Sequence, residues 1–303
     1  MLLMPSKQAR FSVPVWTCQN SYSRLLLPLQ DPYWKRKMRR LYHWLYRKFY
    51  ESPREGYRQR VLAKFSQNPQ FKSWAEELDR EGVLILPSYL GNEDLQACIE
   101  DYSHVRNVKN EADQYTWIDP SHLKCSIPFS KLATDPMLVG LTSYYWGKDV
   151  SLARVEAYIL RPYESSEYGS FQWHHDCEHK RIKVMTLLTD VEADGQRMEY
   201  LPGTHKTWRT WKNYDESRYT DEEVSQHQRK ISCHGPAGTV VLFDTNGIHR
   251  GNRNTVGVRK VWTNVYTAGH NQLEGLELCP DYLEKHSRNS EPFHLNNRKF
   301  QLV

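Results

Sequence analysis

Short apolar segments rich in β-branched and aromatic residues dominate the chain beyond residue 150. Polar turns carrying Gly or Pro separate them, which is the pattern of a sheet made of many short strands. An earlier apolar run that ends at Pro87 predicts one more buried strand. Strands of this length and spacing are typical of a β-sandwich or jelly roll. The predicted strands cover residues 83–87, 151–161, 171–175, 182–191, 198–201, 239–244 and 259–267.

The first half of the chain has a helical pattern instead. From Trp34 onward, apolar side chains recur every three or four residues, and Lys and Arg fill the positions between them. A second helical stretch is interrupted around Asn68-Pro69. The predicted helices cover residues 34–50, 57–78, a segment that begins after Gly91-Asn92, and residues 131–146. The long polar interval 204–234 is predicted to leave the sheet.

Composition narrows the class of protein. The 303 residues are 39% hydrophobic and 25% charged, as in an ordinary globular protein, and a net charge of +5 favours anionic partners only mildly. The six cysteines show no C-x-x-C spacing, so we expect reduced thiols. We find no signal-peptide pattern and no apolar stretch of the ~18 residues that cross a membrane. These features predict a cytoplasmic protein, and without a helix-turn-helix, zinc-finger or RRM signature we expect no nucleic-acid partner.

The segment Trp173-His174-His175-Asp176 offers metal ligands. In a strand, residues two apart point to the same face, so His174 and Asp176 can aim at one point. A second imidazole would complete a triad of two histidines and one carboxylate, which non-haem iron(II) oxygenases use. We predict that His249, just past a strand, supplies it. Other histidines in the same half of the chain remain alternatives: His179, His205 and His234.

Arg259 opens the strand that follows His249, ten residues further on. Its guanidinium offers a planar, permanently charged clamp for a carboxylate. Arg253 is the main alternative for that role. Cys177 directly follows Asp176, and the period of a strand turns it away from the metal, so we interpret it as a packing residue.

In this order, the motifs resemble those of the phytanoyl-CoA dioxygenase family of iron(II)/2-oxoglutarate oxygenases. H-x-D alone is a weak signal, whereas the ordered set is fairly specific. The resemblance covers roughly residues 81–270. Its pieces are the strand Glu81–Pro87, the H-x-D of His174 and Asp176, the turn Pro202-Gly203-Thr204-His205, and the segment from Gly238 through His249 to Arg259.

The resemblance implies a mainly β protein with flanking helices, built on a double-stranded β-helix. It divides the chain into a basic helical extension (1–80), an oxygenase domain (81–270) and a C-terminal tail (271–303). It implies that His174, Asp176 and His249 hold Fe(II), while Arg259 binds 2-oxoglutarate. With O₂, and with ascorbate as a supporting reductant, such an enzyme hydroxylates or otherwise oxidises an unactivated C–H bond and releases succinate and CO₂.

Further residues are candidates from their positions in the strands. Tyr158 could reach the cosubstrate, although it could equally be structural. Trp173, Arg161 and Arg197 could line the cavity of a small-molecule or lipid-like substrate, although each is more often a packing or surface residue.

The basic segment 34–50 is open to three interpretations. It could pack its apolar stripe on the sheet, lie on an anionic membrane as a peripheral contact, or bind another anionic partner. Two alternative functions follow for the whole chain: a metal-binding β-sandwich without oxygenase activity, and a lipid-modifying oxygenase held on membranes by this segment. The sequence does not indicate an oligomeric state.

Overall fold

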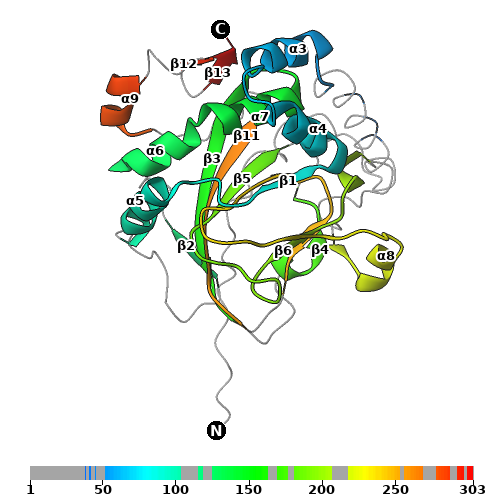
Figure 1. The fold of residues 1–303 in the computed structure, drawn as a ribbon. Coiled ribbons are helices and arrows are strands. Elements are labelled where there is room, and N and C mark those ends of the chain that lie inside the picture. The colour runs from blue at the N-terminus through cyan, green and yellow to red at the C-terminus, as the bar shows by residue number, and fades with distance from the viewer. Residues whose placement is uncertain are drawn as a thin grey trace.

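The computed structural model describes Met38, Leu41, Leu45 and residues 52–103, 115–118, 125–162, 169–176, 181–206, 218–252, 256–268, 278–286, 292–296 and 299–302. Its strands form two antiparallel sheets (Figure 1). The large sheet runs β1 (Val83–Leu86), β9 (Val240–Asp244), β5 (Ile182–Leu187), β11 (Arg259–Thr267), β3 (Val150–Leu160), β13 (Lys299–Leu302) and β12 (Phe293–Asn296), and β2 (Tyr115–Ile118) also pairs with β3. The small sheet runs β7 (Arg218–Tyr219), β4 (Trp173–His174), β10 (His249–Gly251), β6 (Met198–Tyr200) and β8 (Ile231–Cys233). This arrangement confirms the predicted jelly roll.

Strand β11 shows why these sequences form a central strand. It pairs with β5 on one side and with β3 on the other, and nearly all of its residues are buried. On one face, Trp262 and Tyr266 enter the core beneath the helices, where Trp262 stacks on Phe129 with ring centroids 3.8 Å apart. On the other face, Val261 enters the core between the sheets. A strand covered on both faces needs a nearly continuous apolar run.

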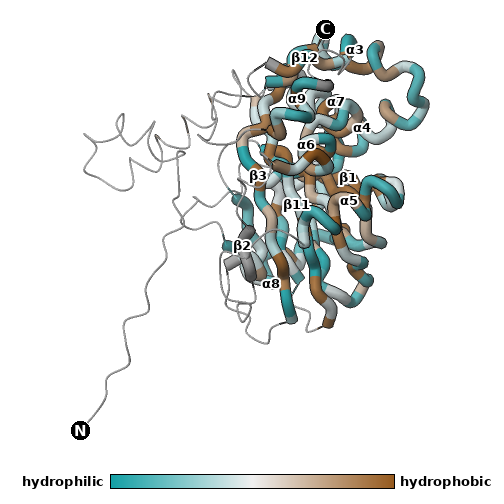
Figure 2. The backbone as a smooth tube through the Cα atoms, turned by 90° about the vertical axis from the view of Figure 1, so that its left-hand side faces the viewer, coloured by the Kyte–Doolittle hydropathy of each residue, from teal (hydrophilic) through white to brown (hydrophobic). Residues whose placement is uncertain are grey.

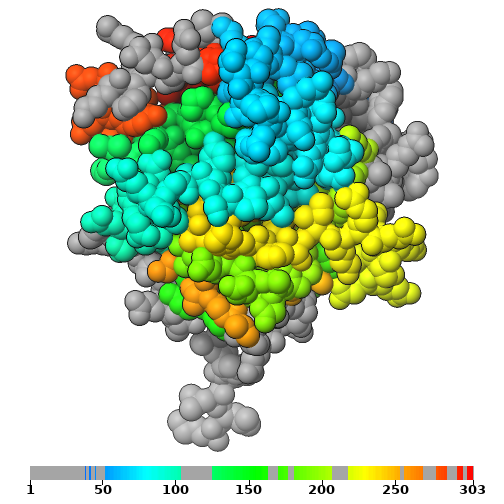
Figure 3. Space-filling model, viewed as in Figure 1, coloured from blue at the N-terminus to red at the C-terminus, as the bar shows by residue number. Residues whose placement is uncertain are grey.

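The helices cover the outer face of the large sheet, and Figure 2 shows their apolar positions recurring where they pack. They are α3 (Glu55–Lys64), α4 (Phe71–Glu81), α5 (Asn92–Ser103), α6 (Ile127–Ala133), α7 (Pro136–Trp146) and α9 (Pro280–His286). The short helix α8 (Asp221–Ser225) instead lies at the edge of the molecule, in yellow in Figure 3. Two 3₁₀ turns, η3 (Gly169–Phe171) and η4 (Thr204–Lys206), flank the small sheet.

Gly82 joins the helical layer to the large sheet. It ends α4 with a left-handed φ of 79°, a conformation that glycine adopts without strain. A Cβ there would lie 2.3 Å from Nδ1 of His205 and 2.6 Å from the Tyr200 hydroxyl. The chain therefore turns directly from α4 into β1 against the small sheet.

Two helical predictions need correction. The single helix predicted over 131–146 is two helices, because Asp135 accepts hydrogen bonds from the amides of Met137 and Leu138 and Pro136 begins α7. The interval 204–234 was predicted to leave the sheet, but β7 and β8 bring its described parts back to the small sheet.

The C-terminal segment is also more than the predicted polar tail. β13 pairs with β3, and the side chains of Phe293 and Phe300 are buried in the helix-covered core. The sequence gives only a weak signal for this role, because the apolar residues of the two strands alternate with polar ones and each strand is short. The division of the chain at residues 81 and 270 stays a prediction.

In the part of the chain that the structure describes, no helix is long and apolar enough to span a bilayer. A cytoplasmic location stays a prediction.

Candidate metal and cosubstrate site

Two neighbouring strands of the small sheet bring two imidazoles together. His174 on β4 and His249 on β10 are directly opposite partners in the antiparallel register, so their side chains leave the same face of the sheet. Their ring centroids are 4.4 Å apart. Both side chains are buried, at 7% and 5% exposure of their residues.

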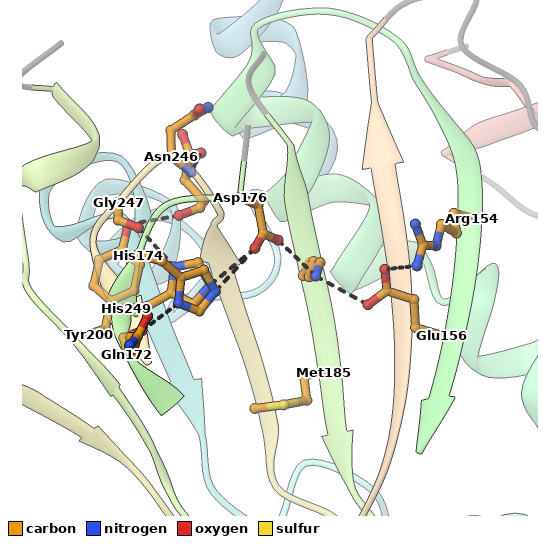
Figure 4. A network of polar contacts seen from close by, with 12 residues as sticks. Arg154, Glu156, Gln172, His174, Asp176, Met185, Tyr200, Asn246, Gly247 and His249 are labelled. Carbon is orange, nitrogen blue, oxygen red and sulfur yellow. Dashed lines mark hydrogen bonds and ion pairs between the residues drawn. The ribbon is translucent and has the colours of Figure 1, made fainter. Parts of the chain in front are cut away.

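Asp176 meets these two imidazoles from just beyond β4. Its amide donates to the carbonyl of Thr245, 2.9 Å away, which fixes the backbone at this point. Its Oδ1 lies 3.4 Å from Nε2 of His174 and 3.7 Å from Nε2 of His249 (Figure 4). One ligand atom from each of the three residues lies within 4.8 Å of the others. The predicted triad is therefore assembled in space.

Hydrogen bonds on the far side of each ring aim Nε2 inward. Nδ1 of His174 lies 2.7 Å from the carbonyl of Gln172, and Nδ1 of His249 lies 2.9 Å from that of Gly247. A carbonyl only accepts, so each Nδ1 carries a proton, and in the neutral ring Nε2 is then the nitrogen with the free lone pair. Metal-bound histidines are held in this way.

Gly247 permits the close packing around His249. A Cβ at this position would lie 1.8 Å from the hydroxyl oxygen of Tyr200. That hydroxyl donates to the carbonyl of Asp244 at 3.0 Å, so it cannot move aside freely. Because residue 247 is a glycine, the backbone carbonyl of Gly247 can approach Nδ1 of the His249 imidazole.

The electrostatics suit a cation. Burial is the main cause that lowers the pKa of His249 to about 3, and the neighbouring His174 lowers it further. Burial by itself would raise the pKa of Asp176, but the ammonium of Lys183 and the two neighbouring histidines together outweigh it and hold that pKa well below its usual value. These pKa shifts keep the His249 imidazole neutral and the Asp176 carboxylate ionised at neutral pH, which are the forms that bind a metal.

Arg259 and Tyr158 lie on the wall of the large sheet that faces the small one. Tyr158 is paired with Val261, two residues along from Arg259, and the guanidinium carbon lies 6.0 Å from the tyrosine ring centre. Arg259 is 4% exposed, and its Nε and Nη1 have no hydrogen-bond partner. Among the described residues, no carboxylate forms an ion pair with it. A buried guanidinium with unpartnered donors is suited to bind an anionic ligand.

Trp173 and Arg197 are not brought to the triad. Neighbouring residues of a strand face opposite ways, so Trp173 points out behind His174. Its indole donates to Asp221 at 2.8 Å and stacks under Arg250 at 4.2 Å. Arg197 lies on this same outer face, where it donates to Ser232 and Glu199.

Arg161 lies just past β3, close enough to Tyr102 for its charge to act on that hydroxyl. The structure gives it no contact with the triad.

The alternative ligands are distributed as follows. The ring of His205 contacts the carbonyl of Asp79 at 3.2 Å, and His234 contacts the carbonyl of Ser232 at 3.1 Å, so neither enters the triad. His179, Cys177 and Arg253 lie outside the described residues.

Sequence reasoning missed a charged row beside Asp176. Lys183 bridges Asp176 and Glu156, and Arg154 pairs with Glu156. The available signal was a charged residue at position 183 inside a mostly apolar strand, together with a charged pair two residues apart on the strand predicted over 151–161.

Fold and site together define the class: a double-stranded β-helix that offers a metal two imidazoles and one carboxylate, as in non-haem iron oxygenases. Residues 78–261, well over half of the chain, match the family described as Phytanoyl-CoA dioxygenase (PhyH). The chain therefore belongs to the phytanoyl-CoA dioxygenase family of iron- and 2-oxoglutarate-dependent dioxygenases.

Individual relatives are distant. An ectoine dioxygenase of Stutzerimonas stutzeri (strain A1501) is 23% identical over 215 residues, which are 59% of this chain and 70% of that protein. The epimerase SnoN from nogalamycin biosynthesis, in complex with Fe3+, alpha ketoglutarate and nogalamycin RO, superposes with a TM-score of 0.52 at 18% identity, over 69% of this chain and 90% of that one. EctD from S. alaskensis with bound Fe gives 0.51 at 20% identity, over 66% and 77%. These solved structures support the fold alone.

Proposed function

We propose that this protein is an iron(II)- and 2-oxoglutarate-dependent dioxygenase that oxidises a C–H bond of a small-molecule substrate. The observation that carries the proposal is a pair of features: a buried triad of metal ligands, and a buried arginine with no carboxylate partner among the described residues. The charges of Asp176 and of Arg259 both act on the Tyr158 hydroxyl. The structures of SnoN with Fe3+ and alpha ketoglutarate bound, and of EctD with Fe bound, support the choice of cofactors.

His174, Asp176 and His249 are proposed to hold the metal. All three approach from the side of the small sheet, because two of them lie on paired strands and the third directly follows one of these strands. Three protein ligands on one side leave the opposite positions of an octahedral ion open for exogenous ligands. When bound, the metal and 2-oxoglutarate together activate O₂ to oxidise the substrate, with release of succinate and CO₂.

Arg259 is proposed to receive the distal carboxylate of 2-oxoglutarate. Its Nε and Nη1 are both unpartnered, so the buried guanidinium can donate hydrogen bonds to a carboxylate and fix its position. Tyr158 shares this wall and presents its hydroxyl near Met185, with 3.8 Å between the oxygen and the sulfur. We propose that Tyr158 borders the cosubstrate and orients it towards the metal.

Arg259, which has no carboxylate partner in the described part of the chain, also separates this proposal from its main competitor. A metal-binding β-sandwich without oxygenase activity needs the triad but has no use for a buried cation that lacks a partner. Such a group costs stability, so its presence favours a protein that binds an anionic cosubstrate.

Turnover in the absence of a substrate offers a direct test. Protein reconstituted with iron(II) should convert 2-oxoglutarate slowly to succinate in air, and the His174→Ala variant should not. Equal succinate formation by both proteins would mean that another site, or free iron, carries the reaction. No succinate from the unsubstituted protein, even when candidate metabolites are supplied, would favour the metal-binding alternative.

A second proposal concerns a membrane partner. Met38, Leu41 and Leu45 are helical and 41%, 46% and 39% exposed, so part of the apolar surface at these three positions is open to solvent. Seven Lys and Arg residues and no acidic residue lie between Trp34 and Tyr50. Exposed apolar side chains flanked by cations suit the surface of an anionic bilayer.

Sedimentation with vesicles tests the membrane proposal. The full chain should pellet with vesicles that contain phosphatidylserine and much less with neutral ones, and Leu41→Asp should weaken the binding. Equal behaviour of the variant, or no binding to anionic vesicles, would contradict a membrane role for this stripe.

A further inference from the structure

Lys183 is the one charged residue of β5 that lies against the proposed metal ligands. Its Nζ is 2.9 Å from Oδ2 of Asp176 and 3.1 Å from a carboxylate oxygen of Glu156. Its side chain is 17% exposed, so the lysine is held between two carboxylates within the fold. Lysine is rarely buried in this way unless it is paired.

The two oxygens of Asp176 are thereby given different partners. Oδ1 is the oxygen that lies near Nε2 of His174 and of His249. Oδ2 is the oxygen that accepts from Lys183. Figure 4 shows Asp176 between the two imidazoles on one side and the Glu156 side chain on the other.

Lys183 is itself fixed from the large sheet. Glu156 on β3 is 6% exposed and shares its second oxygen with Arg154 at 2.9 Å. The ion-pair chain therefore runs from Arg154 through Glu156 and Lys183 to Asp176, across the intervening strand β11. Two cations and two anions alternate along it, so the row has no excess charge beside the metal ligands.

We propose that Lys183 is a positioning residue that makes Asp176 a one-oxygen ligand. The proposal rests on the proposed function, since it takes the triad as the metal site. With Oδ2 held by the ammonium, only Oδ1 faces the metal. Asp176 then fills one coordination position, and the positions that 2-oxoglutarate needs for two of its oxygens stay open. Without Lys183, the carboxylate is free to turn and give both oxygens to the metal.

The test measures cosubstrate binding without turnover. Manganese(II) replaces iron, and calorimetry under nitrogen gives the Kd of 2-oxoglutarate for protein saturated with the metal. Lys183→Met should weaken this Kd by about 10- to 100-fold, the usual effect of removing a group that orients a metal ligand. Lys183→Arg, which can still donate to both carboxylates, should restore most of the affinity. Lys72→Met, at an exposed lysine that also has a carboxylate partner, is the matched control and should change nothing.

The outcomes separate the inference from its foundation. If Lys183→Met unfolds at a lower temperature but binds 2-oxoglutarate as tightly as the unsubstituted protein, Lys183 is merely structural and the proposal is overturned. If Lys183→Met does not fold, Glu156→Gln gives the answer: it loosens the lysine and should weaken 2-oxoglutarate in the same direction, and an unchanged Kd would overturn the proposal. Failure of the unsubstituted protein to bind manganese(II) or 2-oxoglutarate would refute the proposed function instead.

Discussion

Replacing Arg259 by methionine should change stability and ligand affinity in opposite directions. The guanidinium is 4% exposed, and its Nε and Nη1 make no hydrogen bond. Methionine has a similar length and fills the same space without buried donors. The substitution therefore removes the destabilising effect of the unpartnered donors from the ligand-free protein. It also removes the proposed binding partner of the cosubstrate.

The gain in stability follows from the two unpartnered nitrogens, Nε and Nη1. Each unsatisfied buried donor costs about 1–3 kcal/mol, so the free energy of unfolding without ligand should rise by about 2–6 kcal/mol. A cosubstrate carboxylate left without its cation loses about 2–5 kcal/mol, which raises the Kd of 2-oxoglutarate roughly 30-fold to several thousand-fold.

Urea unfolding of the metal-free protein measures the change in stability. Thermal unfolding with manganese(II) and increasing concentrations of 2-oxoglutarate measures the change in affinity. The unsubstituted protein should gain stability with cosubstrate concentration by mass action, and Arg259→Met should gain almost none. Arg60→Met is the matched control at an exposed arginine. Our reasoning fails if Arg259→Met is less stable without ligand and still gains stability with 2-oxoglutarate as the unsubstituted protein does.

Four further outcomes are expected. His249→Ala should lose manganese(II) binding in equilibrium dialysis, and retained binding would place the third ligand elsewhere. The metal-free protein should lose stability as the pH falls from about 6.5 towards 3, by up to about 1.4 kcal/mol per pH unit. The reason is that His249 takes up a proton over this range in the unfolded chain, whereas in the folded protein its pKa is lowered to about 3 and it stays neutral. His249→Gln should flatten this slope in urea unfolding. Arg250→Met should cost about 1.5–3 kcal/mol of unfolding free energy, because it removes one of the two arginines that pair with buried Glu199, and no loss in urea unfolding would deny this contact a stabilising role. Phe300→Ala should cost about 3–5 kcal/mol if the C-terminal strands belong to the fold, whereas a circular-dichroism melt unchanged from that of the unsubstituted protein would show that they do not.

The triad could be predicted because the period of a strand carries local geometry. Residues two apart in a strand point to the same face, so the spacing of His174 and Asp176 predicts that their side chains meet at one site. His249 is different, since no period relates it to His174 and only the antiparallel register of β4 and β10 makes them neighbours. The resemblance to a known family supplied that pairing.

Residues whose role depends on contacts between strands were out of reach. Trp173 resembles a cavity residue in the sequence, but the same period that aligns His174 turns Trp173 outward onto Arg250. Lys183 bonds to Asp176 and Glu156 from a different strand. Phe300 is one of a few apolar residues that alternate with polar ones near the end of the chain, and only the pairing of its strand with β3 shows that it belongs to the core.

Anaerobic titration of the iron(II)-loaded protein with 2-oxoglutarate, followed by visible absorption, tests the central claim most directly. If His174, Asp176 and His249 hold iron and leave room for the cosubstrate, a weak metal-to-ligand charge-transfer band should grow to saturation in the unsubstituted protein and be absent in His174→Ala. Iron bound in stoichiometric amount with no such band would contradict the account.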